Sequence, residues 1–167
     1  GSDLWELSLG DPDNRRPVDY DARRQLLAGL DAGEASLADL LEDWQSGAVK
    51  LAVTRGILAF RSAYPELFAV GDYEALEVTG ARADHAVAWL RTHAGEAVLT
   101  VIPRLVAGLD ADPDWGDTVL DLAEDSPQRW RDILTGTTVA VAAADGAARL
   151  SVAALLAAFP VAVLVPA

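Results

Sequence analysis

The densest group of chemically capable side chains lies near the N-terminus, in Asp11-Pro-Asp-Asn-Arg-Arg-Pro-Val-Asp-Tyr20. Two prolines fix φ there, and carboxylate, amide and guanidinium groups alternate between them. Such a loop can hold its shape through paired arginine–carboxylate hydrogen bonds. The same groups suit a neutral polyol, because each sugar hydroxyl both donates and accepts a hydrogen bond. The candidate substrate-binding residues are therefore Asp13, Asn14, Arg15 and Arg16. An internally cross-linked structural loop explains the pattern equally well.

A second cluster of carboxylates consists of Asp110, Asp112, Asp114 and Asp117. Its spacing invites comparison with a calcium loop. The EF-hand pattern, however, places a glycine at position 6 and a glutamate at position 12. Here Trp115 stands before Gly116, and no glutamate occupies the twelfth position. We therefore predict a solvated acidic turn rather than a metal site.

Histidine and tryptophan offer further candidates. His85 and His93 flank one strand-like run and cannot form a zinc site without carboxylate ligands, so polar strand ends are the simpler interpretation. Tryptophans can stack on the apolar faces of sugar rings. Trp89 and Trp130 lie inside strand-like runs and are predicted core residues, whereas Trp115 lies on a loop and is expected to be exposed. The full set of tryptophans is Trp5, Trp44, Trp89, Trp115 and Trp130.

No recognised catalytic motif occurs elsewhere in the sequence. It contains no glycine-rich phosphate loop, no GxSxG elbow and no HExxH. The absence of cysteine excludes disulfides, thiolate catalysis and cysteine-based metal sites. We therefore predict no catalytic residue, no metal and no cofactor in this chain.

Composition limits the partners. The 167 residues carry 13 Lys and Arg against 26 Asp and Glu, a net charge of −13. Nucleic acid and anionic membranes both require clustered basic residues, so neither is an expected partner. The most apolar run, residues 155–165, is interrupted by Pro160 and is far shorter than the roughly 20 residues of a membrane span. The start at Gly1-Ser2 and the lack of methionine predict an excised piece. No basic stretch precedes an apolar run at its N-terminus, so no signal peptide is expected.

Helical patterns occupy the first part of the chain. Asp19 suits the N-cap of a first helix, and Ser36 with Asp39 three residues later forms a variant of the capping box for a second. The residue before a proline avoids the α region, so Tyr64-Pro65 ends the third. The helices are expected over residues 21–30, 36–45 and 48–63.

The helix predicted over 48–63 is apolar on two sides. One face, about 100° wide, carries Val49, Val53, Ile57, Phe60 and Tyr64. Leu51 and Leu58 lie opposite, a pattern typical of a helix between two layers of protein. If one layer were missing, the uncovered face would either mediate self-association through helix 48–63 or be covered by the N-terminal segment containing Trp5 and Leu7.

The sequence of the rest of the chain predicts short strands. Val-, Leu- and Trp-rich runs alternate with turn residues, which predicts an antiparallel sandwich or meander. Ser151 is expected to cap one or two helical turns that Pro160 stops. The expected strands are 75–79, 86–91, 97–102, 118–122, 130–134, 139–142, 147–150 and 161–165.

The N-terminal segment Asp3-Leu-Trp-Glu-Leu-Ser-Leu-Gly-Asp-Pro-Asp-Asn-Arg-Arg-Pro-Val-Asp-Tyr20 resembles the one that follows the eighth barrel strand of maltooligosyltrehalose synthases, in the α-amylase superfamily. Gly10 departs from the family pattern, where a β-branched residue is usual. Asp3 stands where the family pattern has glutamate, and Glu6 stands where it has aspartate. The similarity covers nearly the whole chain through Arg23-Arg24-Gln-Leu-Leu27, Gly47-Ala-Val-Lys-Leu51, Tyr64-Pro-Glu-Leu-Phe68, Gly71-Asp-Tyr73, Trp130-Arg-Asp-Ile-Leu-Thr-Gly136 and Phe159-Pro-Val-Ala-Val-Leu164.

The resemblance implies an α+β fragment of two parts. Residues 3–68 would be the tail of the catalytic β/α barrel, with its last loop and helices, and residues 69–167 an antiparallel β-sandwich C-terminal domain. The family's catalytic nucleophile, acid/base and stabilising carboxylates all lie upstream, and none matches a position here. The fragment is therefore expected to be inactive alone.

The resemblance also implies the parent reaction. A (1→4)-α-D-glucan 1-α-D-glucosylmutase of this family converts the reducing-end α-1,4 linkage of a maltooligosaccharide or glycogen-derived glucan into an α,α-1,1 (trehalose) linkage by intramolecular transglycosylation. A cytoplasmic location and a trehalohydrolase as pathway partner would follow. The alternative is a stand-alone carbohydrate-binding or structural β-domain without catalysis, which would use Trp115 and the acidic loop.

Overall fold

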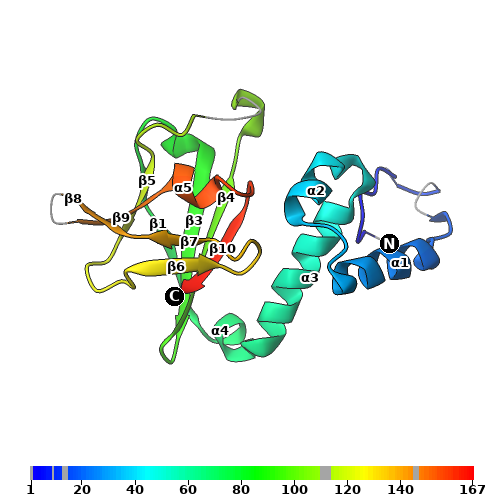
Figure 1. The fold of residues 1–167 in the computed structure, drawn as a ribbon, viewed down its shortest axis with the longest axis horizontal. Coiled ribbons are helices and arrows are strands. Elements are labelled where there is room, and N and C mark those ends of the chain that lie inside the picture. Colours follow the sequence, from blue (N-terminus) through cyan, green and yellow to red (C-terminus); the bar gives the residue numbers. More distant parts are fainter. Residues whose placement is uncertain (1, 9, 13–14, 110–113, 145–146) are drawn as a thin grey trace. The chain divides into compact units, whose positions relative to one another are not determined.

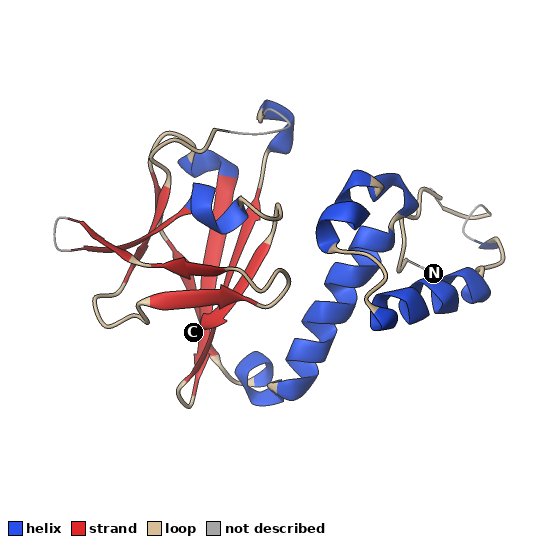
Figure 2. Cartoon of the chain, in the orientation of Figure 1, coloured by secondary structure: helices blue, strands red, loops and turns tan. Residues whose placement is uncertain are grey.

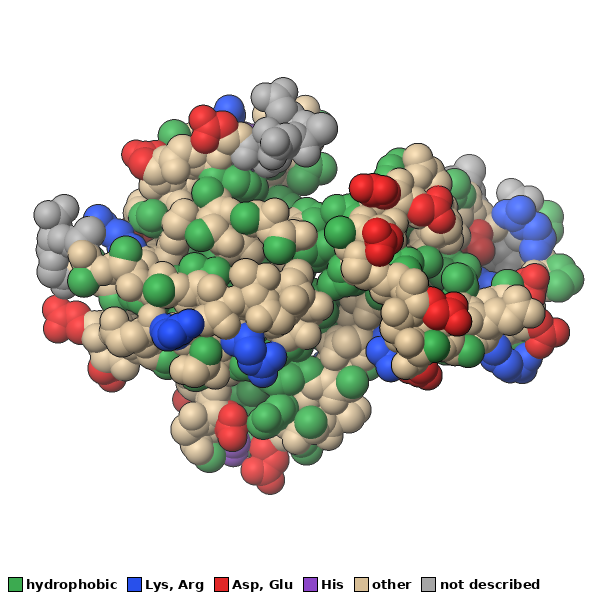
Figure 3. All heavy atoms as spheres, in the orientation of Figure 1, with side chains coloured by type: hydrophobic (Ala, Val, Ile, Leu, Met, Phe, Trp, Pro, Cys, Tyr) green, Lys and Arg blue, Asp and Glu red, His purple; other side chains and the backbone are tan. Residues whose placement is uncertain are grey.

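The computed structural model describes residues 2–8, 10–12, 15–109, 114–144 and 147–167 (Figure 1). The chain forms two compact units, Gly1–Phe60 and Arg61–Ala167. The first is built from helices and loops, whereas the second contains all the strands of the described residues (Figure 2). On the face shown in Figure 3, acidic side chains are scattered over both units rather than gathered into one patch.

The helices of the first unit begin where their caps predict. Helix α1 (Tyr20–Ala32) starts after Asp19, whose side chain accepts a hydrogen bond from the Ala22 amide at 2.9 Å. Helix α2 (Leu37–Glu42) has both bonds of the capping box between Ser36 and Asp39. The predicted second helix is shorter than expected, because its last residues form the 3₁₀ turn η2 (Trp44–Ser46). Gly47, with φ of 77°, then allows the chain to enter α3 (Ala48–Ala63), whose bounds match the prediction.

Ser36→Ala is expected to lower the stability of the first unit by about 0.5–2 kcal/mol, because the Asp39 amide loses its acceptor. The hydroxyl and amide of Ser36 also hold the pKa of Asp39 below its ordinary value of 3.8. Because the pKa of Asp39 is lower in the folded state, its ionised carboxylate stabilises the fold at pH values above its ordinary pKa. This contribution disappears as the pH falls through the folded-state pKa. Urea unfolding followed by far-UV circular dichroism at pH 7 and at pH 3 measures both effects.

The control for this substitution is Thr54→Ala, since Thr54 is an exposed hydroxyl residue in the part of α3 that belongs to the first unit. It caps no helix, so its removal should leave the midpoint unchanged or slightly raised. Equal losses for the two variants at pH 7 would contradict the role of the capping box.

Helix α3 is covered unevenly. Its first turn contains the buried residues Ala48, Val49 and Leu51. The predicted stripe continues half-buried, but Leu58 on the opposite side is 55% exposed. The exposure of Leu58 agrees with the expectation that one side of this helix is uncovered if a neighbouring layer is missing. The N-terminal segment contacts the beginning of the helix, where the Lys50 ammonium donates to the carbonyl oxygens of Ser2 and Leu4 at 2.6 and 3.0 Å.

The second unit contains two sheets in which all neighbouring strands are antiparallel. The strand order is β1-β3-β4-β10-β6-β7 in the six-stranded sheet and β2-β5-β9-β8 in the four-stranded one. The strands are β1 (Asp72–Leu76), β2 (Val78–Thr79), β3 (Ala86–His93), β4 (Glu96–Pro103), β5 (Val119–Leu122), β6 (Arg129–Asp132), β7 (Thr138–Ala140), β8 (Ala142–Ala144), β9 (Ala147–Ser151) and β10 (Ala162–Pro166). The predicted succession of helices followed by antiparallel strands is confirmed.

Two predicted strands are each divided between the sheets. The run 75–79 leaves the six-stranded sheet at Glu77, whose carbonyl accepts from the Asp121 amide at 3.3 Å. The run 139–142 likewise changes sheet at Val141, whose amide donates to the Gln128 carbonyl at 2.9 Å. In both places one strand-like run serves two sheets, because its hydrogen-bonding partners change at a single residue.

One hydrophobic core is shared by the two sheets and α5 (Val152–Leu156). Helix α5 starts at Ser151, whose hydroxyl accepts from the Ala154 amide at 3.3 Å, as predicted. Short helices complete the unit: α4 (Pro65–Ala69), η3 (Ala83–His85) and η4 (Val106–Gly108). The largest fully buried side chains are Trp130, Leu99, Leu120, Leu150, Leu164, Val98, Val101 and Val152.

Candidate functional site

The polar loop before α1 is held by side-chain pairing. Arg15 forms an ion pair with Asp11, and its amide donates to the Pro12 carbonyl at 3.0 Å. Arg16 donates to the Ser8 hydroxyl, and its guanidinium lies 4.0 Å from a carboxylate oxygen of Glu6. Both guanidinium groups remain largely exposed, at 73% and 69%. They can therefore meet a ligand from solvent.

Glu6 supports this loop as a charged acceptor. One of its carboxylate oxygens accepts from the Ser8 amide at 2.7 Å. The hydrogen bonds from Ser8, more than the nearby arginines, hold the pKa of Glu6 below its ordinary value. A carboxyl group with a lowered pKa stays ionised near neutral pH and accepts hydrogen bonds, so Glu6 is unsuited to the role of general acid.

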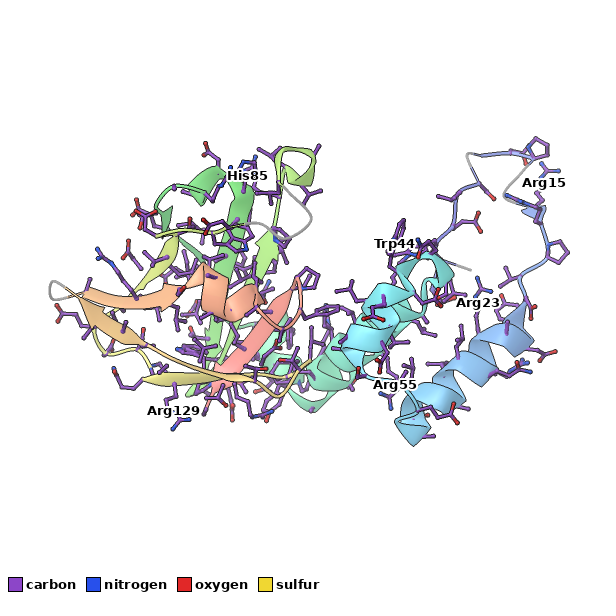
Figure 4. All side chains as sticks on the ribbon, turned by 45° about the horizontal axis from the view of Figure 1, so that its top comes forward. Arg15, Arg23, Trp44, Arg55, His85 and Arg129 are labelled. Carbon is purple, nitrogen blue, oxygen red and sulfur yellow. The ribbon has the colours of Figure 1, made fainter. Side chains whose placement is uncertain are left out.

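Of the four candidate substrate-binding residues, the structure thus places Arg15 and Arg16 together in one loop. Asp13 and Asn14 lie outside the described residues. Figure 4 shows Arg15 in the loop that leads into α1.

A second anchor, which the sequence did not predict, ties the N-terminal segment to α1. The Arg23 side chain lies 3.3 Å from the Asp3 carboxylate and donates to the Asp19 carbonyl at 2.9 Å. Only 16% of the Arg23 side chain is exposed. Arg23 therefore links Asp3 to Asp19, and these two residues lie on either side of the polar loop in the sequence.

A third anchor joins the same segment to the corner between α2 and α3. The Trp5 indole donates to the Trp44 carbonyl at 2.5 Å, and the two rings meet edge-to-face, with centroids 6.4 Å apart. The Lys50 ammonium lies 5.4 Å from the Trp5 ring centroid. A Cβ on Gly47 would lie 2.9 Å from the Trp5 backbone nitrogen, so the segment passes directly over this glycine. The one sequence signal of this anchor is that Lys50 is the only lysine of an acidic chain.

The described carboxylates of the acidic turn near residue 115 accept hydrogen bonds from backbone amides. Asp114 accepts from the Gly116 amide at 2.9 Å, and Asp117 accepts from the Ala81 amide at 2.8 Å. Asp110 and Asp112 lie outside the described residues. Among the residues that the structure describes, no group of three or more His, Cys, Asp or Glu could hold a metal ion.

The expectation that Trp115 is exposed is wrong. Only 6% of Trp115 is exposed, because its ring is part of the hydrophobic core of the second unit. The loop itself is on the surface, but Gly116, with φ of 54°, turns the chain there. A carbohydrate-binding domain that stacks sugars on Trp115 therefore has no support in this structure.

The two histidines have local surroundings. His93 ends β3, and its Nε2 lies 3.4 Å from a carboxylate oxygen of Glu66. His85 ends η3, and its ring lies against Gly108, where a Cβ would come within 3.1 Å of Cε1. Within the described part of the chain, neither belongs to a group of three or more His, Cys, Asp or Glu that could hold a metal ion.

The motif Trp130–Gly136 has a structural explanation. Trp130 is 1% exposed and lies in the core. Asp132, 3% exposed, accepts hydrogen bonds from the amides of Leu134 and Val163 at 2.9 and 3.3 Å and from the Thr135 hydroxyl at 3.1 Å. The buried carboxylate thereby joins the turn after β6 to strand β10.

Within the described ranges, none of the helices combines the length and the apolar character that a membrane span needs.

Comparison with known proteins gives one consistent result. No family model matches the chain. Two Mycobacterium tuberculosis proteins named as maltooligosyl trehalose synthases, from strains CDC 1551 and H37Rv, are each 38% identical to it over 138 residues, or 83% of this chain. The chain spans only 15% of the length of either relative.

Solved structures agree with these relatives. The maltooligosyltrehalose synthase of Arthrobacter ramosus matches 100% of this chain at 37% identity with a TM-score of 0.73, and a point mutant of it gives 0.74. The match covers 19% of those chains. A maltogenic α-amylase from Thermotoga neapolitana, 14% identical over 70% of this chain with a TM-score of 0.51, shares the fold alone. The chain thus belongs to the maltooligosyltrehalose synthase family and corresponds to a small part of that much longer protein.

Proposed function

We propose that this chain is the C-terminal part of an enzyme that converts the reducing-end α-1,4 linkage of a maltooligosaccharide into an α,α-1,1 (trehalose) linkage. The observation that carries the proposal is the 38% identity over 83% of the chain to proteins named for that product. In this proposal residues 3–68 are the tail of a catalytic β/α barrel, and residues 69–167 are a C-terminal domain of β-sandwich type. The parent enzyme is a 1-α-D-glucosylmutase, an intramolecular transferase.

The chemistry would be divided between this chain and the rest of the enzyme. A pair of carboxylates outside the chain forms and breaks a glucosyl-enzyme, as in retaining glycosidases. The released glucose must stay in place and attack through its anomeric hydroxyl, while water is kept out. We assign the retention of that glucose to the polar loop of residues 13–16. The support is that Arg16 is oriented by Ser8 and Glu6 and offers charged hydrogen-bond donors to a hydroxylated ligand.

The first experiment is an activity assay. The chain alone, mixed with maltopentaose, is expected to cause no loss of reducing ends, because the proposal places the catalytic carboxylates outside it. The longer reading frame that contains these residues should convert the same substrate. Turnover by the chain alone, or a reading frame that encodes no barrel upstream of Asp3, would overturn the proposal.

Arg16→Ala in the longer enzyme is expected to increase hydrolysis relative to trehalose formation. The reason is that loss of the guanidinium loosens the loop that retains the released glucose and excludes water. We expect the ratio of free glucose to terminal trehalose linkages to rise about tenfold, which corresponds to roughly 1.4 kcal/mol of discrimination. Chromatographic quantification of both products from maltopentaose measures it.

The matched control is Arg24→Ala. Arg24 is an exposed arginine of α1 that pairs with Asp21 one helical turn away. Its removal should leave the product ratio unchanged. The same change of ratio in both variants would show that loss of any positive charge near α1 is enough, and would remove the assignment from Arg16.

The proposal extends to surroundings and pathway. Maltooligosaccharides and glycogen-derived glucans are the substrates that fit the reaction, and a cytoplasmic location follows from where such glucans are stored. A trehalohydrolase that releases trehalose from the product is the expected next enzyme.

We further propose that the isolated chain self-associates through helix 48–63. Leu58, on the side opposite the stripe that carries Ile57 and Phe60, is 55% exposed, so this side of the helix leaves apolar surface for a second copy. The net charge of −13 opposes contact between copies at low salt. At about 1 M salt the Debye length shrinks to roughly 3 Å, so the dimer should strengthen. Sedimentation velocity at low and high salt tests this, and Leu58→Glu should abolish the dimer. A strict monomer at both salt concentrations contradicts the proposal.

A further inference from the structure

We propose that Trp5 and Trp44 form a stacking platform for a glucosyl residue of an α-1,4-glucan, at a place separate from Arg15 and Arg16. The inference rests on the proposed function for the class of its ligand. It concerns the corner between α2 and α3, where Figure 4 shows Trp44.

The two rings are exposed and yet fixed. Trp5 is 45% exposed and Trp44 is 53% exposed, so neither serves as a core residue. The Trp5 indole N–H is already satisfied by the Trp44 carbonyl. Its backbone is held against Gly47, and Lys50 binds the carbonyl oxygens of Ser2 and Leu4, which precede Trp5 in the chain. A rigid exposed aromatic surface binds with little loss of conformational entropy, which is the property of a preformed site.

The charges at the corner select a neutral ligand. The two residues before Trp44 in the sequence, Glu42 and Asp43, are exposed and add negative charge to this corner, which disfavours an anion. The Lys50 ammonium is bonded to backbone carbonyls and is therefore not free to pair with an anionic ligand. The same ammonium lies 5.4 Å from the Trp5 ring centroid, where it occupies the position that a cationic ligand would take.

A sugar is neutral and can also stack on an aromatic ring, so it suits both the charges and the exposed tryptophans of this corner. The C–H groups on one side of a glucosyl ring present an apolar face to an indole, and its hydroxyls at the ring edge can donate to carboxylates such as those of Glu42 and Asp43. The amide of Gln45, also exposed, adds a group that donates and accepts.

The angle between the rings favours one type of glucan. The two indole planes are inclined at 72°. Successive rings of an α-1,4-linked chain turn relative to one another and follow a curve, whereas a β-1,4-linked chain is flat and suits coplanar aromatic rings. Inclined planes therefore fit maltooligosaccharides better than cello-oligosaccharides.

The test is a titration of the whole 167-residue chain, labelled with ¹⁵N, with maltopentaose. Each tryptophan gives one indole Nε1–H resonance, so the experiment distinguishes the five rings. The Trp5 and Trp44 resonances are expected to shift in a saturable way, while those of the buried Trp115 and Trp130 stay in place. Cellopentaose at the same concentrations should bind at least about tenfold more weakly.

The variants separate stacking from folding. Trp44→Ala retains the backbone carbonyl that accepts from Trp5, so the corner should keep its structure while the affinity falls about tenfold or more. Trp44→Phe should retain most of the affinity. The matched control is Tyr73→Ala, since Tyr73 is a 58% exposed aromatic residue in β1 of the other unit, and its removal should leave binding unchanged.

Three results would overturn the inference. They are the absence of any shift at the Trp5 and Trp44 resonances, equal shifts with cellopentaose, and unchanged affinity in Trp44→Ala. None of them affects the proposed function, which is decided by turnover of the longer enzyme. Conversely, saturable binding to this corner would stand even if the longer enzyme formed a product other than trehalose.

Discussion

Asp132→Ala is expected to lower the free energy of unfolding of the second unit by about 3–5 kcal/mol, because it leaves two backbone amides without an acceptor. The carboxylate is 3% exposed and receives the amides of Leu134 and Val163 as well as the Thr135 hydroxyl. The hydroxyl can rotate to another acceptor, but the two amides cannot move without disturbing the turn and strand β10. Urea unfolding followed by the indole Nε1–H resonance of the buried Trp130 on the same strand measures the loss.

Two variants make this result interpretable. Asp132→Asn keeps one carbonyl oxygen for the two amides and places an N–H₂ group beside the Thr135 hydroxyl, which can accept from it, so it should lose much less. Asp125→Ala removes an exposed aspartate from a turn of the same unit and should change the midpoint little. A loss in Asp132→Asn as large as that in Asp132→Ala would show that the negative charge, and not the pattern of acceptors, is what the fold requires.

Gly47→Ala is expected to destabilise the first unit at least about twice as much as Gly33→Ala. Both glycines have left-handed φ values, 77° and 70°, so each alanine carries the same backbone strain of about 1–2 kcal/mol. A Cβ on Gly33 would meet no atom within 4 Å. A Cβ on Gly47 would lie 2.9 Å from the Trp5 backbone nitrogen and 3.2 Å from the Leu4 Cα. These are backbone atoms and cannot be relieved by a change of rotamer.

The consequence for Gly47→Ala is specific to the N-terminal segment. Displacing Leu4 and Trp5 breaks the hydrogen bonds of Lys50, so the Trp5 indole resonance should move in Gly47→Ala and stay in place in Gly33→Ala. Far-UV circular dichroism during urea unfolding gives the stability difference between the two variants. Equal losses with an unmoved Trp5 resonance would contradict the close approach over Gly47.

Local signals account for what could be predicted from the sequence. The caps at Asp19, Ser36 and Ser151 each act within three residues, so their effect on where a helix starts can be read directly. The bounds of α3 follow in the same way from Gly47 and from Tyr64-Pro65.

The errors come from contacts that are distant in sequence. The division of two strand-like runs at Glu77 and Val141 depends on the partners Asp121 and Gln128, which no local pattern identifies. Trp115 is buried because the core of two sheets reaches the base of its loop, and a loop position alone suggests the opposite. The polar loop, by contrast, can be predicted from the sequence, because acidic, amide and guanidinium groups are dense within one short segment.

The anchors of that loop show the same limit. The pairing of Arg23 with Asp3 spans 20 residues, and the contact of Trp5 with Trp44 spans 39. Charge or aromatic character alone does not select one partner among many. The resemblance of the N-terminal segment to a family pattern indicated that the loop matters, but not which side chains hold it in place.

The position of β10 has a consequence for how the protein is made. In the sheet, β10 lies between β4 and β6. In the sequence, residues 104–161 separate it from β4, and β7, β8 and β9 lie between β6 and β10. During translation β4 and β6 therefore each wait with one unpaired edge until residues 162–166 leave the ribosome. Unpaired edges are the surfaces through which nascent chains aggregate. The six-stranded sheet thus closes late, and a chain truncated just before Ala162 would leave β4 and β6 each with an unpaired edge.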